Sequence, residues 1–202
     1  MAFIDTVPAQ QSTGEVQAMY ERQQVAYGYV PNYAKVFSHR PEVLARWGRL
    51  LAEIRRPMDD RLFELATFAA AVELKSSACS MAHGQKLAEM IGEESVQTLA
   101  SRSCPEEMTE AEKTMLYFAR KVANDASTVE AADLEALKSA GYTDAQIFDI
   151  ATTVAGRAFL TKLLDALGVE LDANVRDLDD EFRSALTVGR PEVWHELEVM
   201  KS

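Results

Sequence analysis

Residues 61–91 read RLFELATFAAAVELKSSACSMAHGQKLAEMI, and this stretch decides the fold. Its first part, 61–75, is apolar on nearly every side of a helix, which is typical of a central, buried helix. Ser76 or Ser77 is expected to cap a second helix over about 78–91. Because the connection is so short, the two helices must pack against each other.

A cysteine and a histidine lie four residues apart in the second helix. Cys79 and His83 are therefore neighbours on one face, with Cβ atoms about 6 Å apart. Cys79 falls in the opening turn, where the positive end of the helix dipole stabilises a thiolate. His83 is placed to take the thiol proton, which is the pairing of a nucleophile with a base. Glu64 lies on the buried helix and needs a partner, and His83 is the obvious candidate.

The same residues allow two interpretations other than a reactive thiol paired with a base. A free cysteine is commonly a small buried hydrophobe, and a Cys-x-x-x-His spacing also arises by chance. A zinc site needs three or four ligands, and Cys79, His83 and Glu64 supply three. Their local spacing fits no closed structural zinc site, so we expect no metal and no cofactor.

The composition is that of a water-soluble globular chain. It has 202 residues, of which 48% are hydrophobic and 26% charged, and a net charge of −11. One domain is expected at this length. An acidic chain without a basic run is a poor match for nucleic acid or an anionic membrane, so we expect neither as a partner.

The apolar runs, the first residues and the cysteines of the chain indicate its cellular compartment. No apolar run approaches the roughly 20 residues of a membrane span. The first residues lack the basic and long apolar regions of a secretory signal. Two cysteines, Cys79 and Cys104, make no disulfide framework. A cytoplasmic location is therefore expected.

Helical periodicity runs through most of the chain, and no alternating β-branched run stands out, so an all-α fold is predicted. Capping boxes at 109–112 and 143–146 each precede an apolar stripe. The core is expected over about 13–170, and the charged tail, 171–202, is expected to lie on a neighbouring subunit or to be mobile. Helices are predicted at about 13–27, 31–37, 42–55, 61–75, 78–91, 93–101, 128–140, 147–167 and 193–200, with another after the first capping box.

The order of these residues resembles the carboxymuconolactone decarboxylase/AhpD-like superfamily. Glu64, Cys79 and His83 stand at the positions of its glutamate, its second cysteine and its histidine. Ser76 stands where its first cysteine belongs. The segments 28–32, 116–122 and 164–169 resemble the peroxidase-related branch of that superfamily, and the likeness spans roughly residues 15–170.

The resemblance implies an AhpD-like, all-helical fold that forms homo-oligomers: dimers, trimers or hexamers. In its dithiol members the second cysteine attacks a peroxide or an oxidised thiol, helped by a Glu–His proton relay, and the first closes the cycle through a disulfide. With Ser76 in that place, an external thiol is needed as reductant. Cys104 is expected to be a bystander rather than the resolving thiol.

Three functions follow from these residues. The first is a thiol-dependent peroxidase or antioxidant oxidoreductase, with Cys79 as nucleophile and Glu64 and His83 as proton relay. The second is a decarboxylase-like acid–base enzyme that acts on a small organic acid. Arg157 interrupts the apolar helix 147–167, so it is expected either in an ion pair, between helices or subunits, or as an anion contact that lines the site with Ser76. The third is a non-catalytic, oligomeric helical protein.

Overall fold

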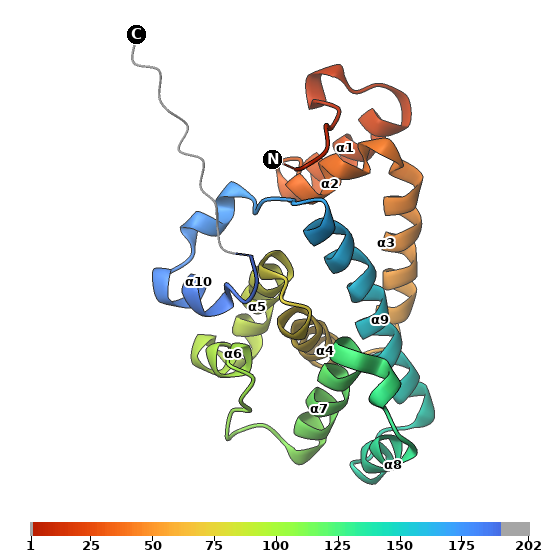
Figure 1. Ribbon diagram of the computed structural model, residues 1–202, viewed down its shortest axis with the longest axis vertical. Coiled ribbons are helices and arrows are strands. Elements are labelled where there is room, and N and C mark those ends of the chain that lie inside the picture. The colour runs from red at the N-terminus through yellow and green to blue at the C-terminus, as the bar shows by residue number, and fades with distance from the viewer. Residues whose placement is uncertain (1, 191–202) are drawn as a thin grey trace.

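The computed structural model describes residues 2–190, which form α-helices, short 3₁₀ turns and loops, with no strand in that range (Figure 1). The predicted all-α fold is confirmed. The helix predicted over 193–200, which contains Trp194 and His195, lies outside the described residues. The α-helices are α1 (Gly14–Tyr27), α2 (Asn32–Val36), α3 (Pro41–Arg55), α4 (Asp60–Glu73), α5 (Ser77–Ile91), α6 (Glu93–Ala100), α7 (Glu110–Asp125), α8 (Ala131–Ser139), α9 (Asp144–Ala166) and α10 (Asp180–Leu186).

Helix α4 is the central helix, as its sequence predicts. Every residue of 63–72 is buried, and α4 packs on α5, α7 and α9 (Figure 1). Its start is fixed by Asp59, whose carboxylate accepts hydrogen bonds from the backbone N–H groups of Arg61 (3.0 Å) and Leu62 (3.1 Å). A helix buried on all sides has no amphipathic stripe, because it has no face toward water.

The turn between α4 and α5 is tight. Lys75 takes a left-handed conformation (φ +56°), its N–H donates to the carbonyl of Val72, and the N–H of Ser76 donates to the carbonyl of Ala71. This pair of bonds closes the end of α4. The chain reverses within three residues, so α5 begins at Ser77 and packs directly on α4.

Helix α9 joins two clusters of buried apolar side chains. Ile150 and Val154, in its first half, belong to the larger cluster, which surrounds α4. Leu160 and Leu164, in its second half, belong to a smaller cluster with α1, α2 and the start of α3. The middle of α9 therefore lies between the two clusters, and α9 packs beside α4.

The described part of the tail, residues 171–190, packs on its own chain. Phe182 and Leu186 of α10 are buried in the larger cluster, so the core extends past residue 170. Ser80 donates a hydrogen bond to the carbonyl of Leu186, and the N–H of Gly189 donates to Oγ of Ser77 at 3.2 Å. The spacing of Phe182 and Leu186, one helical turn, supplies the apolar face that docks here.

The remaining predictions differ little from the structure. Both capping boxes are formed, with Thr109 and Thr143 at the N-caps. The helix predicted from 128 begins only at Ala131, because Asp125 accepts a hydrogen bond from Ser127 N–H and holds 126–128 as a 3₁₀ turn. Among residues 2–190, no helix is long and apolar enough to cross a membrane.

Candidate active site

Glu64 and His83 form a buried pair between α4 and α5. Nδ1–H of His83 donates to Oε2 of Glu64 at 2.6 Å, and the two residues are 8% and 1% exposed respectively. Glu64 lies in the second turn of α4 and His83 in the second turn of α5, so the tight turn between the helices brings them face to face. The bond leaves Nε2 as the ring nitrogen that is free to accept a proton.

The protonation states of this pair follow from burial and charge. Burial lowers the pKa of His83 to about 4, against the opposing effect of Glu64, and the charge of Arg157 lowers it further. Burial acts to raise the pKa of Glu64, but the hydrogen bond from His83 and the charges of Lys86 and Arg157 outweigh it and lower that pKa. At neutral pH the pair is therefore a carboxylate that orients a neutral imidazole.

Cys79 is the third residue of α5 and is 8% exposed. Within the described chain, the hydrogen-bond partner of its Sγ is Oγ1 of Thr161, at 3.5 Å, rather than His83. Thr161 is fully buried in α9. Sequence reasoning missed this residue, because nothing in the pattern of α9 distinguishes Thr161 from a polar position in an apolar helix. The site therefore has walls from three helices, α4, α5 and α9.

Ser76 occupies the N-cap position of α5 but does not cap it. Its hydroxyl makes no capping hydrogen bond, and its Oγ is buried without a partner among the described residues. The expectation that Ser76 caps the helix through its side chain is therefore wrong, because the hydroxyl lies in the interior rather than over the N–H groups of the first turn. Its position places it three residues before Cys79, on the same side of α5.

Arg157 lies on α9 one turn before Thr161, and its charge lowers the pKa values of Glu64 and His83. Its Cζ is 5.3 Å from the ring centre of Phe63 and 5.9 Å from that of Trp47. The expected ion pair between helices is not formed within residues 2–190. Glu64, a carboxylate that acts on the pKa of Arg157, is bonded to His83 instead.

The remaining candidate groups are the second cysteine, Cys104, and the possible metal ligands. Cys104 lies in the loop between α6 and α7, packed against the larger cluster, and both cysteines are free thiols. Across residues 2–190, no three His, Cys, Asp or Glu side chains gather closely enough to hold a metal ion. The candidate site thus consists of Glu64, Cys79 and His83 with Thr161 and Arg157 around them.

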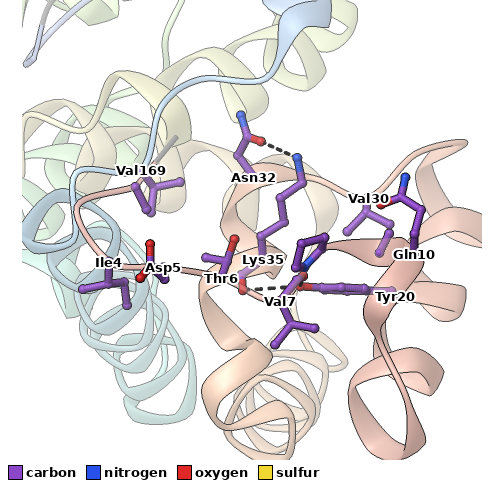
Figure 2. A pocket seen from close by; sticks show the side chains of 13 residues that line it. Ile4, Asp5, Thr6, Val7, Gln10, Tyr20, Val30, Asn32, Lys35 and Val169 are labelled. Atoms are coloured by element: carbon purple, nitrogen blue, oxygen red, sulfur yellow. Dashed lines mark hydrogen bonds between the residues drawn. The ribbon is translucent and has the colours of Figure 1, made fainter.

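A separate cavity of about 530 Å³ lies under the N-terminal segment (Figure 2). It is lined by Ala2, by residues 4–10, and by Tyr20, Lys35 and a few neighbours, and none of the candidate site residues lines it. Lys35 donates to Oδ1 of Asn32 at 2.8 Å, and the hydroxyl of Tyr20 donates to the carbonyl of Val7 at 2.8 Å. Lys35 and Tyr20, two polar side chains of this cavity, are therefore bonded within the chain.

Comparison with known proteins identifies the fold. The structure of an alkylhydroperoxidase AhpD core, an uncharacterised peroxidase-related protein from Ralstonia eutropha, superposes with a TM-score of 0.74 over 94% of this chain and 98% of its own, at 21% identity. The chain has the AhpD-like fold. An uncharacterised peroxidase-related protein from a Silicibacter species superposes with a TM-score of 0.69 over 85% and 90% of the two chains, at 23% identity.

The AhpD-like fold also carries other chemistry. The debrominase Bmp8, in a structure with 2,3,4-tribromopyrrole, superposes with a TM-score of 0.71 over 88% of this chain and 96% of its own, at 15% identity. No family model and no curated protein matches the sequence. The neighbours therefore establish the AhpD-like architecture, and the chemistry has to be argued from the site.

Proposed function

We propose that this chain is a thiol-dependent oxidoreductase of the alkylhydroperoxidase type, with Cys79 as its redox nucleophile and Glu64 and His83 as its proton relay. The observation that carries the proposal is the buried bond between Glu64 and His83. A neutral imidazole held by a carboxylate, one helical turn from a buried thiol, is the arrangement of a base beside its nucleophile. The peroxidase-related AhpD-like neighbours support the same class.

The first half-reaction consumes one hydroperoxide. Nε2 of His83 takes the proton of the Cys79 thiol, and the thiolate attacks the terminal peroxide oxygen. The S–O bond forms, the O–O bond breaks, and the leaving alkoxide receives the proton back from His83 as an alcohol. Cys79 ends as a sulfenic acid, oxidised by two electrons while the peroxide is reduced by two.

The second half-reaction requires thiols from outside the chain. One external thiol displaces water from the sulfenic acid and forms a mixed disulfide, and a second releases the Cys79 thiol and leaves as the external disulfide. Ser76 supplies no sulfur for an internal disulfide. Cys104 lies on a different element, in the loop between α6 and α7, and its thiol is free. The proposed substrate set is therefore a peroxide and a low-molecular-weight or protein thiol.

The test is sulfenic acid trapping on the full-length chain. Dimedone is expected to label the wild type after peroxide treatment at one residue, Cys79. The Cys79→Ser variant is expected to lose both the label and peroxide consumption, while the matched Cys104→Ser variant keeps them. Peroxide consumption that is unchanged in Cys79→Ser contradicts the proposal.

A second candidate is acid–base chemistry on a small organic acid. It is favoured by one observation, the half-buried charge of Arg157 beside a relay that works without a thiol. The test is turnover of a lactone acid. Turnover that survives alkylation of Cys79 but is lost in the His83→Ala variant selects this candidate. Absence of both activities, with the fold intact, leaves the non-catalytic helical protein.

A further inference from the structure

The guanidinium of Arg157 is a half-buried positive charge beside the reacting groups, and its Nε atom is fully buried. Arg157 and Thr161 are four residues apart on α9, so they share the face that reaches Cys79. Burial lowers the pKa of Arg157, and the neighbouring Cys79 and Glu64 side chains act to raise it. It therefore belongs to the environment in which a substrate of Cys79 has to bind.

This charge has no counter-ion bonded to it among residues 2–190. Nε of Arg157 is buried and makes no hydrogen bond, and burial lowers the pKa of the guanidinium. The single buried carboxylate nearby, Glu64, is bonded to His83. A cation taken partly out of water without a bonded anion costs stability, and a bound anion lowers that cost.

The surroundings of Arg157 are aromatic. Phe63 and Trp47 lie within 5.3 Å and 5.9 Å of its Cζ. The indole N–H of Trp47 is already donated to the carbonyl of Gly156 at 3.0 Å, so Trp47 offers only its ring. A guanidinium binds a carboxylate through two parallel hydrogen bonds, and aromatic rings favour an apolar body next to it.

We infer that the site takes an organic substrate with a carboxylate group, bound by Arg157 beside the ring of Trp47. This inference rests on the proposed function for the identity of the reacting group, Cys79, but not for the binding step. In the proposed reaction the substrate is then an acidic organic hydroperoxide whose peroxide end reaches Cys79. Arg157 acts as a specificity-determining residue.

The binding test uses a matched pair of unreactive probes, para-isopropylbenzoate and para-isopropylbenzamide, which differ in charge but hardly in shape. Binding to the full-length chain is followed by the fluorescence of Trp47, with Trp47→Phe to identify the signal. The wild type is expected to bind the benzoate roughly 10- to 100-fold more tightly than the amide, as for one charge-assisted bidentate contact. The benzoate is also expected to slow alkylation of Cys79 by iodoacetamide.

Arg157→Gln is expected to remove this preference, Arg157→Lys to retain part of it, and Arg49→Gln, at an exposed position on α3, to leave it unchanged. Far-UV circular dichroism verifies that each variant is folded. Equal binding of the two probes by the wild type, or a preference that survives in Arg157→Gln, overturns the inference. A third outcome also overturns the inference: the wild type shows no probe preference, and light scattering finds a lower oligomer mass for Arg157→Gln than for the wild type. Arg157 then pairs with a second copy of the chain instead of a substrate.

The two proposals fail separately. If Cys79→Ser still prefers the benzoate while the wild type forms no sulfenic acid, the carboxylate site stands and the peroxidase function falls. If the wild type forms sulfenic acid with neutral and acidic hydroperoxides at the same rate and binds both probes equally, the peroxidase stands and the carboxylate site falls.

Discussion

Cys79 Sγ lies 3.5 Å from the hydroxyl oxygen of Thr161, a residue 82 positions further along the chain. This contact joins α5 to α9 at the point where the thiol would react. A hydroxyl that donates to a thiolate stabilises the anion by a charge-assisted hydrogen bond, which is stronger than one between neutral groups.

Thr161→Val removes this hydroxyl and keeps the shape of the side chain. We expect the rate of Cys79 alkylation by iodoacetamide at neutral pH to fall by roughly tenfold or more, since a hydrogen bond to a charged group contributes about 1.5–3 kcal/mol. Thr161→Ser keeps the hydroxyl and is expected to react like the wild type. Identical alkylation rates for the Val and Ser variants would show that the hydroxyl has no role.

His83→Ala removes the proposed base. We expect the rate of sulfenic acid formation to fall about 10²–10⁴-fold, which is the usual contribution of a positioned acid–base group. Glu64→Gln keeps a hydrogen-bond acceptor for Nδ1–H but loses the charge, so a smaller loss is expected. Stopped-flow oxidation of the wild type and both variants measures these rates, and a larger loss in Glu64→Gln than in His83→Ala contradicts the assigned roles.

Acidification is expected to destabilise the protein through His83. Its folded pKa, about 4, lies below its ordinary value of 6.5, so between these pH values the unfolded chain binds more protons than the folded one. Stability is then full above about pH 6.5 and falls as the pH drops toward 4, by more than about 1 kcal/mol. Glu64, with a lowered pKa, contributes in the same direction.

Urea unfolding at several pH values measures this loss, with His83→Gln as the comparison because glutamine does not titrate. The slope of unfolding free energy against pH between 6.5 and 4 is expected to be smaller in the variant. Equal slopes would falsify the assignment of a neutral, buried His83.

Ser76→Cys restores two cysteines to the first turn of α5, three residues apart. We expect peroxide to convert this variant to an internal disulfide, seen by intact mass as a loss of two hydrogens, whereas the wild type gains one oxygen. Adding Cys79→Ser should abolish the disulfide. A variant that still gains oxygen and forms no disulfide shows that position 76 does not face Cys79.

Gly189→Ala is expected to detach the segment that covers the turn between α4 and α5. A Cβ atom at Gly189 would lie 1.7 Å from the carbonyl oxygen of Lys75, and that backbone cannot move without disturbing the end of α4. We expect a loss of a few kcal/mol of unfolding free energy, in the range of strained core substitutions. Gly48→Ala on α3, where a Cβ meets nothing within 4 Å, is the matched control and should be neutral or slightly stabilising. Thermal melts of the two variants compare the sites directly.

Local interactions made much of this protein predictable from its sequence. The caps at Asp59, Thr109 and Thr143 act within three residues, and the apolar surface of α4 marks it as the central helix. The proximity of Cys79 and His83 is a property of one helix. The meeting of Glu64 with His83 follows from a turn of only a few residues between two helices that must pack.

The tertiary structure alone decided what surrounds these residues. Thr161 meets Cys79, and Gly189 meets Lys75, only because segments remote in sequence are brought together by burial of apolar surface. Whether Arg157 finds a carboxylate depends in the same way on which helices face α9, and a sequence pattern records the residue but not its neighbours. Periodicity and capping determine single helices, whereas the partners of a buried polar group are set by packing across the whole chain.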